Sequence, residues 1–125
     1  MIRYLMDANA AVYAMDVGHE ALTDRIARCV PGEIGISTIS FAEVAYGTYI
    51  GKPPSPVVLD AFVAAIPLIA FDEAAARAYA RLPFTRARFD RLLAAHALSI
   101  EATVITANLS DFTDIQGLVV EDWTV

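Results

Sequence analysis

The hydrophobic positions of this chain form short apolar runs that alternate with longer stretches of helical periodicity. Apolar runs bounded by Gly, Pro or polar residues are typical of buried strands, whereas apolar residues that recur every three or four positions are typical of helices. The runs predict strands at residues 4–6, 34–37, 67–71, 103–106 and 118–120. The periodic stretches predict helices at residues 8–15, 20–29, 39–50, 57–65, 73–82 and 86–100.

This alternation of strands and helices predicts an α/β fold. Such a chain forms a central parallel sheet, here of about four to five strands, with helices on both faces. Candidate N-caps precede three of the helices: Ser37 or Thr38, Asp72, and Thr85. We expect a single domain over residues 1–125, because the one loop-like run, residues 52–56, is too short to separate two domains.

The composition excludes several classes of protein. Cys29 is the only cysteine, so the chain forms no internal disulfide and no cysteine metal cluster. The longest stretch without a charged residue is residues 61–71, interrupted by Pro67, whereas a membrane span needs ~17–25 apolar residues. Asp7 follows the start too closely for a signal peptide. We therefore expect a soluble, cytoplasmic protein that does not bind membranes, and its 57% of hydrophobic residues indicates surface reserved for a partner.

The charge balance argues against a general nucleic-acid binder, because phosphate contacts need a basic surface. Lys and Arg number 9 against 15 acidic residues, which gives a net charge of −6. However, five arginines lie within residues 77–91, where Asp90 is the only acid. Arginine side chains suit phosphate groups. Two interpretations stay open: a surface that guides an RNA backbone, or an ordinary solvated helix surface.

Polar residues follow two of the predicted strands. Asp7 closes the first strand, and Thr106, Asn108 and Asp111 follow the fourth. Ligands of parallel sheets bind beyond the carboxyl ends of the strands, so these residues meet at the edge where chemistry is expected. Each also has a purely structural interpretation, since Asp is a common N-cap and both Asp and Asn favour turns.

Glu43 and Asp90 are the other candidate carboxylates. Glu43 follows Ser40 at the spacing of a capping box, but a cap at Ser37 or Thr38 places Glu43 inside the helix beside an apolar stripe. An unpaired carboxylate is costly there. Asp90 lies early in its helix, where a negative charge is favourable. It shares a face with Ala94 and Ala97, and this small face could hold it over the sheet edge.

Carboxylates gathered at one edge repel one another, and a bound cation relieves that repulsion. Oxygen ligands suit Mg²⁺ or Mn²⁺, ions that activate water and stabilise charge in phosphate chemistry. Phosphodiester hydrolysis is therefore the expected reaction class. His96 falls within the buried stripe of its helix, so we expect a hydrogen-bonded core residue rather than a ligand. Cys29 is expected to contribute packing.

Five segments of the chain together resemble the PIN-domain nucleases, most closely the VapC-type toxins. They are YLMDAN at residues 4–9, ISTISFAEVAYG at 36–47, FDRLLAAHA at 89–97, TANLSDF at 106–112 and GLVVEDW at 117–123. Each segment alone is a weak signature, but the five stand in the family's order and cover essentially the whole chain. Ala8 departs from the pattern, because the family usually has threonine there.

The resemblance implies a PIN-like three-layer α/β/α fold and a ribonuclease activity that depends on Mg²⁺ or Mn²⁺. It also implies a homodimer inhibited by a cognate antitoxin protein. The implied catalytic residues are Asp7, Glu43, Asp90 and Asp111, with Asp7, Asp90 and Asp111 as metal ligands. The implied supporting residues are Asn9, Thr106 and Asn108. We further predict that Arg86, Arg88 and Arg91 contact the RNA substrate.

Other functions fit the residues less well. A phosphotransferase of the haloacid dehalogenase type needs a second Asp two residues after the first, where this chain has Asn9. That class and response-regulator receivers both need a lysine, and Lys52 lies in the proline-rich loop. A PIN-like interaction module that binds a protein or RNA without cutting stays open. Ala8 and the net acidity favour it, whereas the intact carboxylate set disfavours it.

Overall fold

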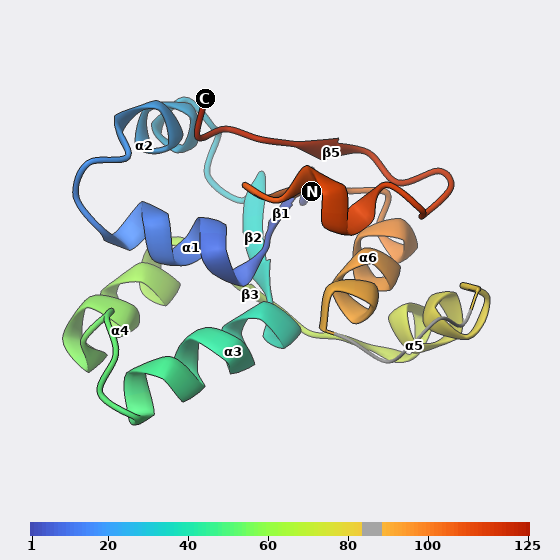
Figure 1. Cartoon of the computed structure of the whole chain (residues 1–125), viewed down its shortest axis with the longest axis horizontal. Coiled ribbons are helices and arrows are strands. Elements are labelled where there is room, and N and C mark those ends of the chain that lie inside the picture. Colours follow the sequence, from blue (N-terminus) through green and yellow to red (C-terminus); the bar gives the residue numbers. More distant parts are fainter. Residues whose placement is uncertain (84–88) are drawn as a thin grey trace.

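The computed structural model describes residues 1–83 and 89–125 and confirms the α/β fold (Figure 1). Its sheet has five parallel strands in the order β3-β2-β1-β4-β5. The strands are β1 (Tyr4–Met6), β2 (Ile34–Ser37), β3 (Leu68–Ile69), β4 (Thr103–Ile105) and β5 (Val120–Glu121). The helices are α1 (Ala8–Met15), α2 (Glu20–Ala27), α3 (Thr38–Tyr49), α4 (Pro56–Ala65), α5 (Glu73–Ala80), α6 (Phe89–Ser99) and the 3₁₀ helix η1 (Leu109–Phe112).

The central strand of the sheet is β1, which pairs with β2 on one side and β4 on the other. Met6 lies opposite Ile36 in one pairing and opposite Ile105 in the other. Because all three strands run the same way, they end at one edge of the sheet. The residue after β1 is Asp7, which therefore stands in the middle of that edge.

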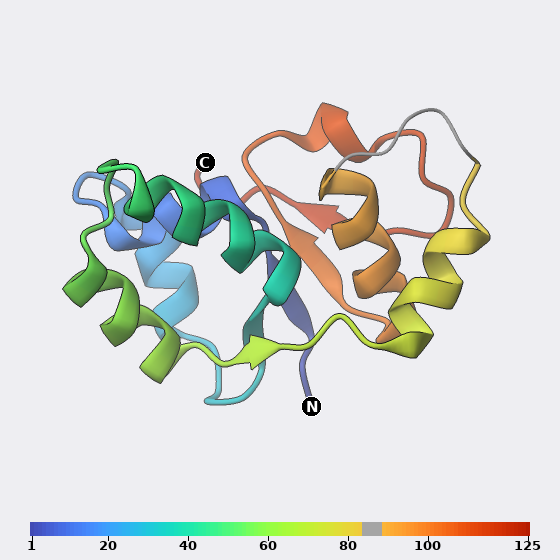
Figure 2. The same ribbon diagram turned by 90° about the horizontal axis from the view of Figure 1, so that it is seen from below.

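Helices cover both faces of the sheet, which gives three layers. Helices α1 to α4 lie on one side and α5, α6 and η1 on the other (Figure 1 and Figure 2). Neighbouring β1 side chains point to opposite faces. Met6 accordingly joins the core with α1 to α4, whereas Leu5 joins the core with α6 and η1. Among the described residues, none of the helices is long and apolar enough to cross a membrane.

Several helix starts use the expected caps. Ser37 caps α3, because its Oγ accepts a hydrogen bond from the N–H of Ile39 at 3.0 Å. Asp72 caps α5 in the same way through the N–H of Ala75 at 3.0 Å. The capping-box interpretation of Ser40 and Glu43 is therefore wrong, since α3 begins earlier. The predicted cap at Thr85 lies outside the described residues.

The strands at the two sides of the sheet differ from their predicted ranges. Only Leu68 and Ile69 of residues 67–71 pair with β2, and β5 covers residues 120–121 instead of 118–120. These edge strands pair on one side only, so turn geometry overrides their apolar patterns. Gly35 allows β3 to approach, because a Cβ there would stand 2.8 Å from Cγ1 of Ile69.

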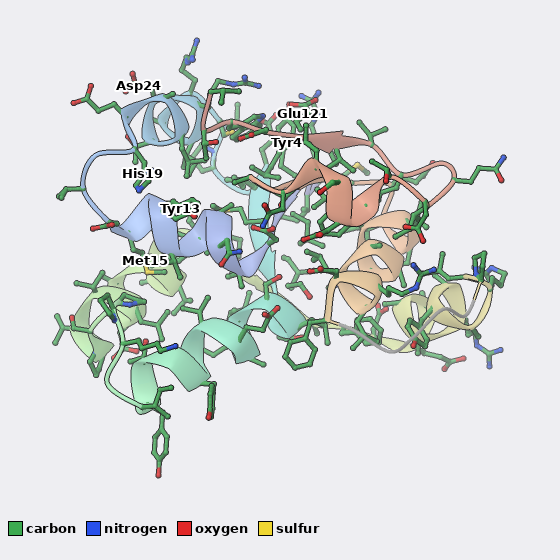
Figure 3. The ribbon with its side chains drawn as sticks, in the orientation of Figure 1. Tyr4, Tyr13, Met15, His19, Asp24 and Glu121 are labelled. Carbon is green, nitrogen blue, oxygen red and sulfur yellow. The ribbon has the colours of Figure 1, made fainter. Side chains whose placement is uncertain are left out.

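Ring contacts fix the connection between α1 and α2. Tyr13, near the end of α1, stacks on His19 with ring centroids 4.5 Å apart (Figure 3). The His19 Nε2 lies 3.9 Å from the carboxylate of Asp16. This turn follows the end of α1, whereas Asp7 precedes the first residue of that helix. The contacts of the turn therefore stabilise the fold and are separate from Asp7.

Candidate active site

Asp7 combines a structural role with a place at the candidate site. It is 7% exposed, and its Oδ1 accepts a hydrogen bond from the N–H of Ala10 at 2.8 Å, so it caps α1. Burial is the main cause that raises the pKa of Asp7, and the charges of Asp90 and Asp111 raise it further. The hydrogen bonds from Thr106 and Ala10 act in the opposite direction. The N-cap interpretation and the site interpretation therefore hold for the same carboxylate.

Thr106 connects the ends of two strands. It follows β4 directly, is buried, and its hydroxyl donates a hydrogen bond to the carboxylate of Asp7. The same oxygen accepts from the N–H of Asn108 at 2.9 Å. The N–H of Asp7 in turn donates to the carbonyl of Ile105 at 3.0 Å. Thr106 is thus a positioning residue that fixes the Asp7 carboxylate relative to β4.

Glu43 reaches the site from α3. It is exposed, whereas the next residue, Val44, is buried in the core. Partial burial of the carboxyl group raises the pKa of Glu43, and the charges of Asp90 and Asp7 raise it further. These three carboxylates are therefore within electrostatic reach of one another.

Asp90 lies in the first turn of α6 and is half-buried. Ala94 and Ala97 of the same helix are fully buried against Leu5 and Val104 of the sheet, so the small-residue face packs as expected. The charge of Asp90 raises the pKa of both Asp7 and Glu43. The charge of Asp90 therefore acts on both of the other carboxylates.

Asp111, Asn108 and Asn9 surround this group. Asp111 is exposed in η1, and its charge contributes to the raised pKa of Asp7. Asn108 is exposed just before η1 and contacts Thr106 through its backbone. Asn9 is exposed in the first turn of α1. The structure thus places the other three predicted carboxylates, Glu43, Asp90 and Asp111, within electrostatic reach of Asp7, while the catalytic and metal-binding roles of all four stay predictions.

The chemistry of these carboxylates fits a divalent cation. Within residues 1–83 and 89–125, no Lys, Arg or His forms an ion pair with Asp7, Glu43 or Asp111. The charge of Asp90 contributes to the raised pKa of both Asp7 and Glu43, and a bound cation would relieve this repulsion. In the same described ranges, no three His, Cys, Asp or Glu side chains form a ready metal-binding group.

The predicted RNA-binding arginines need one correction. Arg91 is 6% exposed, and its guanidinium group donates to Asp114 at 3.0 Å and to the carbonyl of Pro83 at 2.7 Å. A buried guanidinium group with both contacts inside the protein is not placed to meet RNA. Its role is to join α6 to the two neighbouring loops. Arg86 and Arg88 lie outside the described residues.

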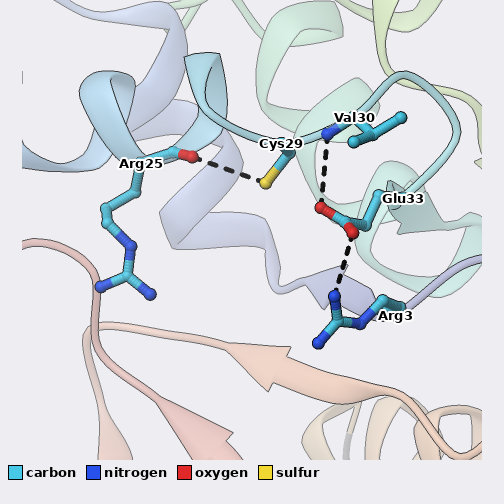
Figure 4. Close-up of polar contacts among 5 residues, drawn as sticks. All are labelled: Arg3, Arg25, Cys29, Val30 and Glu33. Atoms are coloured by element: carbon cyan, nitrogen blue, oxygen red, sulfur yellow. Dashed lines mark hydrogen bonds and ion pairs between the residues drawn. The ribbon is translucent and has the colours of Figure 1, made fainter.

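His96 and Cys29 have the packing roles expected of them. His96 is 1% exposed and its Nδ1 lies 2.8 Å from Oγ of Ser37. Cys29 packs at the border of a core and donates to the carbonyl of Arg25, while Glu33 accepts from Arg3 and from the N–H of Val30 (Figure 4). Burial and the neighbouring Glu33 raise the pKa of the Cys29 thiol, so it is a weak nucleophile.

A groove beside the carboxylates was not predicted from the sequence. It encloses about 300 Å³, and its lining includes Asn9, Glu43, Tyr46 and Lys52. A second hollow of about 300 Å³ shares Lys52 with it. Tyr46 is 65% exposed and follows Glu43 by three residues, a spacing that puts both on one helix face. That spacing could have identified Tyr46, whereas Lys52 looked like an ordinary loop residue.

Comparisons with known proteins agree with this geometry. The family model "PIN domain" matches residues 4–118. A tRNA(fMet)-specific endonuclease VapC of Shigella flexneri is 26% identical, with 99% of this chain and 100% of that protein covered. A ribonuclease VapC2 of Rickettsia felis is 28% identical, with 96% and 97% covered. The crystal structure of Rickettsia felis VapBC2 bound to a promoter DNA fragment superposes with a TM-score of 0.85 at 28% identity, covering 98% and 99%.

Proposed function

The chain belongs to the PIN domain family, and from this we propose that it is a metal-dependent endoribonuclease, the toxin of a toxin–antitoxin pair. The observation that carries this proposal is the group of carboxylates around Asp7 at the end of a parallel sheet, where the charges of neighbouring acids contribute to the raised pKa of Asp7 and of Glu43. Relatives over nearly the whole length are named ribonucleases or endonucleases, which supports RNA as the substrate.

The proposed mechanism assigns each side chain a task. Asp7, Asp90 and Asp111 would hold Mg²⁺ or Mn²⁺, which supplies an activated water and stabilises charge on the phosphate. Glu43 would contribute as a further ligand of the ion or, with its raised pKa, orient the attacking water and accept its proton. Thr106 keeps the Asp7 carboxylate in place. Water attacks the phosphorus atom, and the phosphodiester bond of the RNA is hydrolysed.

RNA would reach the carboxylates along the groove that Lys52 and Tyr46 line. Single-stranded RNA is held by cations that meet its phosphates and by aromatic rings that stack on its bases. Lys52 and the exposed ring of Tyr46 supply one of each beside Glu43. We propose that Arg86 and Arg88 add further phosphate contacts near Asp90.

The partner proposals follow from exposed hydrophobic residues on α3, at its C-cap and on α4. They are Tyr46, Tyr49, Ile50, Val57 and Val58. Exposed apolar patches of this kind mark interaction sites. The similar crystal structures are VapBC complexes, which supports a cognate antitoxin on this chain. An antitoxin seated here would also cover the groove beside Glu43. A homodimer is the second assembly that we propose.

The decisive experiment incubates the purified, antitoxin-free chain with RNA in Mn²⁺ or in EDTA. Asp7→Asn tests the carboxylate group, and Asp24→Asn, an exposed residue of α2, is the matched control. We expect cleavage by the wild type and the control in Mn²⁺ only, and none by Asp7→Asn. Equal cleavage in EDTA would contradict metal dependence. RNA binding by the wild type without any cleavage would favour the interaction module.

A further inference from the structure

A buried hydrogen bond joins the two helices that carry Glu43 and Asp90. His96 lies on α6, six residues after Asp90, and its Nδ1 is 2.8 Å from Oγ of Ser37. Ser37 ends β2, caps α3 and is fully buried. The proposed mechanism uses neither His96 nor Ser37, yet their bond spans the gap between the two carboxylate-bearing helices.

The bond joins a buried imidazole to the hydroxyl group that caps α3. Oγ of Ser37 accepts from the N–H of Ile39 at 3.0 Å and keeps a second lone pair and its hydroxyl hydrogen for His96. The contact with Nδ1 therefore fits both neutral tautomers of the ring, one with Nδ1 accepting and one with Nδ1–H donating. Burial lowers the pKa of His96, against the opposing charge of Asp72 at the start of α5, and so favours the neutral ring.

A second contact holds the start of α3 from the side of β3. The ring of Phe71 meets the ring of His96 edge-on, with centroids 5.6 Å apart. The N–H of Phe71 donates to Oγ1 of Thr38, the first residue of α3, at 3.1 Å. The beginning of α3 is thus fixed by α6 and by the segment before α5. Glu43 follows within roughly two helical turns, so a shift at Ser37 moves Glu43 relative to Asp90.

We propose that His96 is a positioning residue: through its hydrogen bond with Ser37, it sets the separation of α3 and α6 and thereby the affinity of the Glu43 and Asp90 carboxylates for a divalent cation. This inference rests on the proposed function, because it requires that the carboxylates bind a cation. Partners that orient metal-binding groups typically contribute 10–100-fold to metal affinity.

Two substitutions of His96 separate hydrogen bonding from packing. His96→Leu keeps most of the side-chain volume but loses the hydrogen bond. His96→Asn loses volume but keeps an amide group that can accept or donate near the position of Nδ1. Ser37→Ala removes the hydroxyl partner together with the cap of α3, and Ser55→Ala is its matched control, because Ser55 caps α4 through the N–H of Val58. The measurement is calorimetric titration of each purified, antitoxin-free full chain with Mn²⁺, with thermal unfolding recorded alongside.

We expect His96→Leu and Ser37→Ala each to weaken Mn²⁺ binding by about tenfold or more. The double variant should bind Mn²⁺ little more weakly than Ser37→Ala alone, since both substitutions remove the bond between His96 and Ser37. His96→Asn should recover most of the affinity, and Ser55→Ala should bind as the wild type does. If His96→Leu does not fold, the comparison of His96→Asn and Ser37→Ala with the wild type decides.

Two results overturn the inference in distinguishable ways. Mn²⁺ affinity in folded His96→Leu or Ser37→Ala that equals the wild-type value refutes the positioning role alone. Tighter binding by His96→Leu than by His96→Asn does the same, since packing would then be the cause. A wild-type chain that neither binds Mn²⁺ nor cuts RNA would refute the proposed function itself.

Discussion

Replacing the carboxylate of Asp7 with an amide removes its charge and keeps its hydrogen-bonding shape. Asn is as good an N-cap as Asp, so Asp7→Asn retains the bond from the Ala10 N–H. The amide can also stay bonded to the Thr106 hydroxyl. Asp7→Ala removes the charge as well, but it loses both bonds. The two variants together therefore separate the charge of Asp7 from its contribution to the fold.

The difference in stability between the two variants follows from those two bonds. Losing an N-cap costs about 1 kcal/mol. Losing a neutral hydrogen bond such as the one from Thr106 costs about 1 kcal/mol more. Asp7→Ala should therefore unfold at a free energy about 2 kcal/mol below that of Asp7→Asn. For a chain of this size, that corresponds to a Tm lower by roughly 8 °C.

The wild type should be no more stable than Asp7→Asn when metal is absent. The pKa of Asp7 is raised in the folded protein, so the ionised form destabilises the fold at pH 7. As the pH falls through the raised pKa, Asp7 takes up a proton and the wild type should approach Asp7→Asn. The gap should vanish below the ordinary value of 3.8, where the unfolded chain is protonated too. Thermal unfolding in EDTA across this pH range measures the gap, since bound metal would stabilise the wild type.

Both variants should lose cleavage by at least about 100-fold. A metal ligand contributes several kcal/mol to stabilising charge in the transition state, and each 1.36 kcal/mol is tenfold in rate. Two results would refute this reasoning: Asp7→Ala as stable as Asp7→Asn, or Asp7→Asn cutting RNA at the wild-type rate. The first result would show that Asp7 does not stabilise the fold as an N-cap of α1. The second would show that cleavage does not need the charge of Asp7.

Three further predictions concern RNA binding and the frame of the fold. Changing Arg86 and Arg88 to Ala should weaken RNA binding. The magnitude of the slope of log affinity against log salt should fall by about 0.7 for each phosphate that the two arginines neutralise. An unchanged slope would show that neither arginine contacts the RNA phosphates. Arg91→Met should leave that slope alone but lower stability by about 1–3 kcal/mol in denaturant titration, because Pro83 and Asp114 lose their donor. Gly35→Ala should cost about 1–3 kcal/mol by the same assay, because its Cβ would meet Ile69, and wild-type stability would contradict the close packing of β3 on β2.

The fold was largely predictable because its signals are local. Strand β2 has four residues between a turn and the cap of α3, and helix α1 begins directly after Asp7. Both elements can be predicted from neighbouring residues alone. The edge strands were less predictable, because the pairing of Leu68 and Val120 depends on how far distant segments approach the sheet. Sequence patterns carry no information on that distance.

The candidate site was predictable as a set of residue types and less so in its contacts. Asp7 and Asp111 follow strands of a parallel sheet and had to meet at one edge, and the charge of Asp111 does act on Asp7. The environment of Arg91 was missed, because its ion-pair partner, Asp114, lies on a separate loop. The lining of the groove by Lys52 was missed for the same physical reason: two segments distant in sequence form it.

The order of the strands also bears on when this chain becomes active during its synthesis. Asp7 leaves the ribosome well before Asp111, which belongs to η1, and β4 must pair with β1 before Thr106 can reach Asp7. A growing chain therefore holds an incomplete set of carboxylates until η1 has been made. Under the proposed function, nuclease activity begins only after that point, and until then the ribosome works beside a chain that cannot yet cut.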